Sequence, residues 1–303
     1  MTSRTAAPRS RPLRAIVPAT ESARDRFRSL DPYRAEREWK RYEGTPQREL
    51  FRALRQRFLA RHPGPEGWSA DLGSGPGRFT LEIGPPRARR VALDLSLEML
   101  RRASGTDAAP FPAERVRGDA SRPPLAPGRF GAVALLGNTL GFAGRAGEDL
   151  LAAAESLVAA GGRLLIEIAP AAGERSRYLA RLPSSAVARL LRSPTAAVLP
   201  RVLREGFEEE PARRAEPGAF RRWTAEELAA RWRTAGWTRE ETMAIAPALG
   251  PETQRLEAIR RDAKAWKHLQ DLEEAIGRTP ERWSRAAAVL LAASAPSEKR
   301  RIK

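Results

Sequence analysis

The chain has 303 residues, of which 42% are hydrophobic and 30% are charged, so it can bury a core. Its length suits one large α/β domain with insertions or two small domains. It contains no cysteine, which excludes disulfides, thiolate zinc sites and cysteine nucleophiles. It contains only two histidines, so we expect no metal site. No apolar run approaches the roughly 18 residues that a membrane helix needs.

The formal net charge of +17 is concentrated at the two ends. Residues 1–14 carry four arginines and no acid, and residues 298–303 carry four basic side chains and one acid. Such arms favour phosphate-rich partners such as RNA through counterion release. The alternative is a bias of composition toward Arg. We expect residues 1–30 to form a disordered basic tail and residues 297–303 to form a second basic tail. Because the first residues hold no apolar segment of a secretory signal, we expect a cytoplasmic protein, with an organellar transit peptide as the alternative.

Between these ends the sequence alternates predicted strands with predicted helices. Thr45 and Pro46 indicate the N-cap and first position of an amphipathic helix over 46–61, which follows a charged segment with interleaved aromatic residues. Further helical segments are expected near 77–83, 96–104 and 147–160. Short apolar runs predict strands over 68–72, 90–95, 115–117, 131–136 and 162–169. Strands that alternate with helices imply a parallel sheet.

The later part of the chain departs from this alternation. We expect two insertions that form a substrate lid, over 171–220 and 251–284, with helical pieces near 174–192 and one long charged helix over 252–276. The insertions are separated by a capping box, in which Thr at the N-cap is followed by Glu at the third helical position. The box spans Thr224–Glu227 and its helix ends near Gly236, with further strands expected over 237–246 and 286–293.

Residues 68–84, WSADLGSGPGRFTLEIG, place three glycines at alternate positions between a predicted strand and a predicted helix. A nucleoside triphosphate loop needs Lys and then Ser or Thr after its last glycine, but Arg78 and Phe79 follow Gly77. A dinucleotide loop needs Gly at the sixth position counted from Gly73, and Arg78 is there. Both phosphate-binding loops are therefore disfavoured, and S-adenosylmethionine is the third ligand to consider.

The pattern Asp-x-Gly-x-Gly-x-Gly resembles motif I of the class I S-adenosylmethionine-dependent methyltransferases. Asp94 ends the second strand run, 21 residues after Gly73, and Asp119 ends the third, where that family binds ribose and adenine. The likeness covers residues 68–170 well and 220–295 loosely. It implies an α/β fold with a Rossmann-like, doubly wound, seven-stranded and mostly parallel sheet with helical insertions. The methyltransferase domain would span 68–296, behind an N-terminal helical cap over 31–67.

The resemblance also implies the residues that bind S-adenosylmethionine. Glycines in the loop let the backbone approach the ligand, Asp71 would face its ammonium group, Asp94 its ribose and Asp119 its adenine. S-adenosylmethionine carries no phosphate, and its ribose and adenine need hydrogen-bond acceptors. The alternative for each acid is a turn or N-cap role. The expected cofactor-binding residues are Asp71, Gly73, Ser74, Gly75, Gly77, Asp94, Leu95, Asp119, Ala120, Gly137 and Asn138.

The implied activity is methyl transfer to oxygen or nitrogen of a small or medium-sized acceptor. Gly137-Asn-Thr-Leu140 departs from the Asn/Asp-Pro-Pro-aromatic motif of some nucleic-acid amino methyltransferases. Two alternatives stay open, namely an RNA methyltransferase that uses the basic ends as arms and a binding module without turnover. Glu167 is a candidate acid or base, with structural pairing to an arginine as the alternative. The candidate substrate contacts are Tyr33, Arg37, Tyr178, Arg221, Arg222 and Trp223, and Tyr33, Arg37, Trp39 and Tyr42 are also candidates for a cofactor lid.

Overall fold

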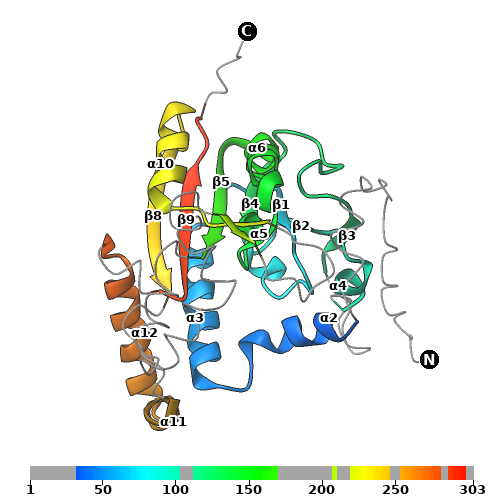
Figure 1. The fold of residues 1–303 in the computed structure, drawn as a ribbon. Coiled ribbons are helices and arrows are strands. Elements are labelled where there is room, and N and C mark those ends of the chain that lie inside the picture. The colour runs from blue at the N-terminus through cyan, green and yellow to red at the C-terminus, as the bar shows by residue number, and fades with distance from the viewer. Residues whose placement is uncertain are drawn as a thin grey trace, which may run out of the picture.

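A computed structural model describes residues 32–102, 112–169, 207–209, 219–245, 253–280 and 286–297. Seven strands form one sheet in the order β3-β2-β1-β4-β5-β9-β8 (Figure 1). β9 pairs antiparallel with both of its neighbours, and the other pairs are parallel. The strands are β1 (Trp68–Leu72), β2 (Arg89–Asp94), β3 (Glu114–Arg117), β4 (Phe130–Leu135), β5 (Val158–Ile168), β8 (Thr238–Ile245) and β9 (Ala288–Ser294). The predicted seven-stranded, mostly parallel sheet is confirmed.

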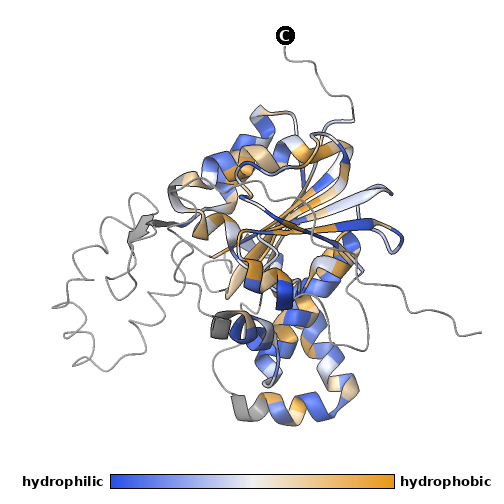
Figure 2. Ribbon diagram, turned by 90° about the vertical axis from the view of Figure 1, so that its right-hand side faces the viewer, coloured by the Kyte–Doolittle hydropathy of each residue, from blue (hydrophilic) through white to orange (hydrophobic). Residues whose placement is uncertain are grey.

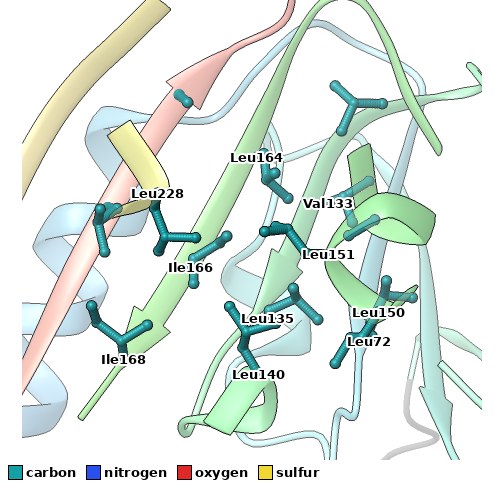
Figure 3. Close-up of a cluster of buried hydrophobic side chains, with 14 of the residues drawn as sticks. Leu72, Val133, Leu135, Leu140, Leu150, Leu151, Leu164, Ile166, Ile168 and Leu228 are labelled. Atoms are coloured by element: carbon teal, nitrogen blue, oxygen red, sulfur yellow. The ribbon is translucent and has the colours of Figure 1, made fainter. Parts of the chain in front are cut away.

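Each face of the sheet carries its own buried cluster, because successive residues of a strand point to opposite faces. In β4, Val133 and Leu135 belong to the cluster under α6 (Gly147–Leu157) and α10 (Ala225–Thr234), which Figure 3 shows in part. Ala132 and Ala134 belong to the other cluster, under α3 (Pro46–Arg61). Figure 2 shows the resulting apolar strands between helices with polar outer faces. Helices on both faces make the sheet doubly wound.

The helix ends that have a capping signal lie where the sequence predicts them. α3 spans Pro46–Arg61, and the Thr45 hydroxyl accepts the Arg48 N–H at 3.3 Å. The capping box of α10 is present in full, with Thr224 and Glu227 each accepting a backbone N–H. α4 (Leu97–Arg102) begins after Ser96, whose hydroxyl accepts the Met99 N–H at 3.3 Å.

Two predicted helices are wrong. The segment 77–83 forms turns and a short 3-10 helix, η2 (Thr80–Glu82), because Gly75 and Gly77 adopt positive φ and Thr80 is tied to Asp71. No α-helix therefore begins at the glycine loop. The predicted long helix 252–276 is two helices, α11 (Thr253–Arg261) and α12 (Ala263–Gly277). They separate at Asp262, whose carboxylate accepts the N–H groups of Lys264 and Ala265 and so caps α12.

The remaining elements surround the carboxyl ends of the strands or extend the domain. They are α2 (Pro32–Trp39), η1 (Lys40–Tyr42), α5 (Thr139–Phe142), η3 (Gly144–Ala146) and an antiparallel pair of strands, β6 (Phe207–Glu209) and β7 (Ala219–Arg221). The predicted tails and the helical pieces near 174–192 lie outside the described residues. The domain boundaries stay a prediction. Within the described part of the chain, no helix is both long and apolar enough to cross a membrane.

Candidate cofactor site

The glycine loop leaves β1 and is held between β2 and α5. The N–H groups of Gly73 and Ser74 both donate to the carbonyl oxygen of Leu93 in β2, at 2.8 and 3.0 Å. On the other side Gly73 packs directly on the Thr139 side chain, so that a Cβ at this position would clash with it. Gly73, Gly75 and Gly77 have φ of 69°, 54° and 74°, a region that glycine adopts without strain. The backbone conformation of the loop therefore requires glycine at these positions.

Asp94, at the end of β2, is oriented by the backbone on both sides. Its Oδ2 accepts the Gly75 N–H and its Oδ1 accepts the Ser96 N–H, each at 2.8 Å. Burial raises the pKa of Asp94, and the backbone hydrogen bonds from Ser96, Gly75 and Leu95 oppose the increase. Because each carboxylate oxygen has two lone pairs, these three donors leave Asp94 able to accept a further hydrogen bond from a ligand hydroxyl.

Asp71 is deeply buried, with 3% of its surface exposed. Its Oδ2 accepts the hydroxyl of Thr80 at 2.6 Å, which ties the end of β1 to η2 and closes the base of the loop. Burial raises the pKa of Asp71 to about 7, the Thr80 hydrogen bond opposes this shift, and the charge of Asp94 adds to it. A cationic group beside Asp71 would favour its ionised form.

Asp119 follows β3 at the same edge of the sheet. Its Oδ1 accepts both the N–H and the hydroxyl of Ser121, at 2.9 and 2.7 Å. Within the described residues both of its hydrogen bonds go to Oδ1, which leaves Oδ2 for a ligand. The N–H of Gly118 donates to the Asp94 carbonyl, and Ala120 packs against the core, so this turn is fixed relative to β2.

The turn after β4 is the third segment of the site. Gly137 and Asn138 have φ of 62° and 65°, and Asn138 is the one non-glycine residue with positive φ in the described part of the chain. The Asn138 side-chain oxygen accepts the Ala169 N–H at 3.0 Å, which joins the ends of β4 and β5. A Cβ on Gly141 would lie 2.7 and 2.8 Å from the two amide atoms of Asn138, so Gly141 leaves room for that side chain.

Glu167 lies in β5 and forms a buried ion pair with Arg55 of α3. The Arg55 Nε donates to Oε2 at 2.8 Å, and its Nη2 donates to Oε1. Glu167 also accepts the Gly137 N–H at 3.2 Å. Burial acts to raise the pKa of Glu167, but the Arg55 guanidinium outweighs burial and the pKa is lowered. Glu167 thus makes the structural pairing that was the alternative to a catalytic role.

The candidate substrate residues are not all placed beside this site. Trp223 is 2% exposed and belongs to the core under α6 and α10. Arg221 lies over the Trp223 ring, 3.6 Å from its centroid, and forms ion pairs with Glu148 and Glu227. Both residues have structural roles here, and we do not retain them as acceptor contacts. Arg222 is half-buried, and Arg37 is exposed on α2. Tyr178 and the side chains of Tyr33 and Tyr42 lie outside what the structure describes.

The open side of the site fits a ligand without phosphates. A Cβ added to Gly75 or Gly137 would meet no atom of the described residues within 4 Å, so both glycines face free space. Asp94, at the end of β2, and Asp119, after the neighbouring strand β3, supply carboxylate acceptors near the loop that would repel a phosphate. The loop lacks the α-helix N-terminus that pyrophosphate sites use. No cluster of His, Cys, Asp and Glu suited to a metal ion occurs among the described residues.

Comparison with known proteins identifies the family. Residues 70–162, which contain the loop and all three acids, match a family model described as a methyltransferase domain. The chain carries a class I methyltransferase domain. The chain is a methyltransferase, as the sequence predicts, and its fold is that of S-adenosylmethionine-dependent methyltransferases. No curated protein sequence matches the chain.

Solved structures show that the whole methyltransferase fold is shared. One is the Haloferax volcanii complex of the Trm112 methyltransferase activator with a candidate methyltransferase, at 18% identity over 91% of this chain and 98% of that one, with a TM-score of 0.50. Another is a candidate S-adenosylmethionine-dependent methyltransferase from Listeria monocytogenes, at 13% identity over 84% of this chain and 99% of that one, with a TM-score of 0.51. At these identities the likeness concerns the fold.

Sequence reasoning missed Arg55, although it helps to hold the end of β5. One signal was available: the amphipathic pattern of 46–61 gives buried positions to Leu54, Phe58 and Leu59, and Arg55 lies next to them on the same face. An arginine at a buried helical position indicates a buried partner, because an unpaired charge there is costly. The identity of that partner, 112 residues away, has no local signal.

Proposed function

We propose that this methyltransferase acts on oxygen or nitrogen of a small or medium-sized acceptor. The observation that carries the proposal is the close approach of β7 to α5. A Cβ on Gly141 would lie 3.0 Å from the carbonyl oxygen of Arg221, so the backbone of β7 crosses α5 beside the Asn138 side chain. Chain segments that cover the carboxyl ends of the strands limit the space for an acceptor, which favours a small molecule over a nucleic-acid duplex.

The roles of the cofactor-binding residues are part of this proposal. Asp94 binds the ribose hydroxyls, Asp119 binds the adenine amino group, and Asp71 faces the ammonium group. Gly137 and Asn138 line the methionine end, and Glu167 is a positioning residue that holds the Gly137 N–H and the α3 side of the site. The bound S-adenosylmethionine supplies an electrophilic methyl group on a sulfonium.

A lone pair of the acceptor atom would form the new bond to the methyl carbon of bound S-adenosylmethionine as its carbon–sulfur bond breaks. This would leave S-adenosylhomocysteine as a neutral thioether and an acceptor proton that passes to solvent. The contribution of the protein is to hold the two reactants in line, which alone can supply a large part of the rate enhancement. The pairing of Glu167 with Arg55 makes it a weak base, so we assign it no proton transfer.

The test is S-adenosylhomocysteine release with a metabolite pool and with bulk RNA as separate acceptors. It uses the full chain and a chain that lacks residues 1–30 and 298–303. We expect turnover with the metabolite pool and expect the trimmed chain to keep it. Turnover that needs RNA, weakens with salt and is lost on trimming would instead identify an RNA methyltransferase. Cofactor binding without turnover on either pool would identify a binding module. A cytoplasmic location stays a prediction.

A further inference from the structure

Trp39, the last residue of α2, contacts two arginines from different parts of the cofactor site. The guanidinium carbon of Arg78 lies 4.6 Å from the centroid of the Trp39 ring, and that of Arg102 lies 4.4 Å from it. Arg78 directly follows Gly77 in the glycine loop. Arg102 ends α4, the helix that begins just after Asp94. One aromatic ring therefore joins the N-terminal cap to the glycine loop and to the helix that follows Asp94.

Carboxylates from the same part of the chain hold the two arginines in place. Glu43, just after η1, forms an ion pair with Arg78, and Glu36 of α2 accepts a hydrogen bond from the Arg102 Nε at 2.7 Å. The Arg78 side chain is only 12% exposed, so its position depends on these neighbours. Figure 1 shows α2 on the side of the sheet toward which β5 points, which is the side of the cofactor site.

We propose that Trp39 is a positioning residue for the glycine loop, which couples docking of α2 to cofactor binding. If α2 moved away together with η1, Arg78 would lose both the ring and Glu43, and the loop that carries Gly73, Gly75 and Gly77 would lose its outer support. A cofactor that needs this loop geometry binds more tightly when α2 is docked. By reciprocity, the bound cofactor stabilises the docked position of α2 to the same extent. The inference rests on the cofactor assignment and does not depend on the acceptor.

The chain offers a matched control for this contact. Arg89, at the start of β2, lies over the ring of Trp68, at the start of β1, with its guanidinium carbon 4.1 Å from the centroid. This pair is of the same chemical kind as Arg102 with Trp39, but it lies at the amino ends of the strands, away from the glycine loop. Arg89→Ala therefore removes a stacked arginine without touching the site.

The experiment measures the Kd of S-adenosylhomocysteine by calorimetry for the wild type, Trp39→Ala, Trp39→Phe, Arg102→Ala and Arg89→Ala. It also measures amide hydrogen exchange of residues 35–42 with and without S-adenosylhomocysteine. We expect Trp39→Ala and Arg102→Ala to weaken binding on the order of 10-fold, the scale of a partly buried cation–π contact, and to lose the protection that the ligand confers on α2. Trp39→Phe keeps an aromatic ring and should restore part of both effects, and Arg89→Ala should change neither.

The proposal is overturned if folded Arg102→Ala, together with Trp39→Ala where that variant folds, binds with the wild-type Kd and shows the wild-type protection of α2. It is also overturned if Arg89→Ala weakens binding as much as Arg102→Ala, because the effect would then be general destabilisation. Arg102 lies outside the glycine loop, so Arg102→Ala still tests the proposal if Trp39→Ala does not fold. A wild-type protein that does not bind S-adenosylhomocysteine would contradict the cofactor assignment itself, which separates the two failures.

Discussion

Asp71 combines deep burial with one hydrogen bond, from Thr80, and this makes it a source of pH-dependent stability. Its pKa of about 7 in the folded chain lies above the ordinary value of 3.8. The native state therefore holds a proton where the unfolded chain has lost it. The free energy of unfolding falls as pH rises from about 4 to about 7 and is flat above that, and the total loss is about 4 kcal/mol.

The variant Asp71→Asn should remove this dependence, because the amide cannot ionise but can still accept the Thr80 hydroxyl. We expect the stability of the wild type, relative to the variant, to fall steadily between pH 4 and pH 7. Urea unfolding at pH 5, 6, 7 and 8 measures it. Asp262→Asn is the control, since Asp262 caps α12 through its oxygen atoms far from the site. If the free energy of unfolding changes with pH in the same way for the wild type and Asp71→Asn, the raised pKa of Asp71 is not the source of the pH dependence.

At the scale of elements, the Arg55–Glu167 pair joins α3 to β5 across one face of the sheet. The two side chains are 5% and 4% exposed. Removal of one partner leaves an uncompensated buried charge, which typically costs about 3–5 kcal/mol. Arg55→Met should therefore destabilise the fold by about that amount, and adding Glu167→Gln should recover most of the loss while keeping an acceptor for the Gly137 N–H. Urea unfolding of Arg55→Met, Glu167→Gln and the double variant measures the coupling energy. If the losses of the two single variants simply add in the double variant, the two side chains are not coupled.

The elements also show which structural features a local sequence signal can predict. Helices with a capping residue, such as Thr45 for α3 and Thr224 for α10, have the predicted ends. The error at 77–83 arose from the expectation that a helix follows the glycine loop, whereas the positive φ of Gly77 and the hydrogen bond from Thr80 decide the backbone. The error at Asp262 was avoidable in principle, because an aspartate inside a predicted helix is also a good N-cap.

At the scale of the whole molecule, an ion-pair network fastens α12 and β8 to the end of α3. Glu241 of β8 accepts hydrogen bonds from Arg61 and Arg278, and the ring of His62 lies 2.7 Å from it. Burial acts to raise the pKa of Glu241, but the hydrogen bonds from His62, Arg61 and Arg278 outweigh it and lower the pKa to about 2. Glu241 therefore stabilises the fold above its ordinary pKa of 4.5, and this stabilisation is lost as pH falls toward 2.

Glu241→Gln should lower the stability at pH 7, and the difference from the wild type should shrink as pH falls below 4.5. Thermal unfolding at pH 7, 4 and 3 measures this change. Glu257→Gln is the control, because Glu257 is a half-exposed member of a surface pair with Arg260 and should have a small effect. A loss that is the same at every pH would show that shape, not charge, explains the contribution of Glu241.

The alternation of strands and helices and the three acids near the strand ends could be predicted because each depends on local patterns and on one family motif. Contacts between distant segments could not. The stacking of Trp39 with Arg78 and Arg102, and the pairing of Arg55 with Glu167, join residues far apart in the chain that no periodicity connects. The burial of Trp223 could not be predicted either, because an aromatic residue that follows two arginines in the sequence is typical of a binding surface.

The most direct test of the account is a calorimetric titration of S-adenosylhomocysteine into the wild type and Asp94→Ala. The account predicts one site in the wild type and a loss of affinity of about 100-fold in Asp94→Ala, because two hydrogen bonds to a charged group are removed. Asp262→Ala should bind like the wild type. Equal affinity in a folded Asp94→Ala protein, or no binding by the wild type, would contradict the account.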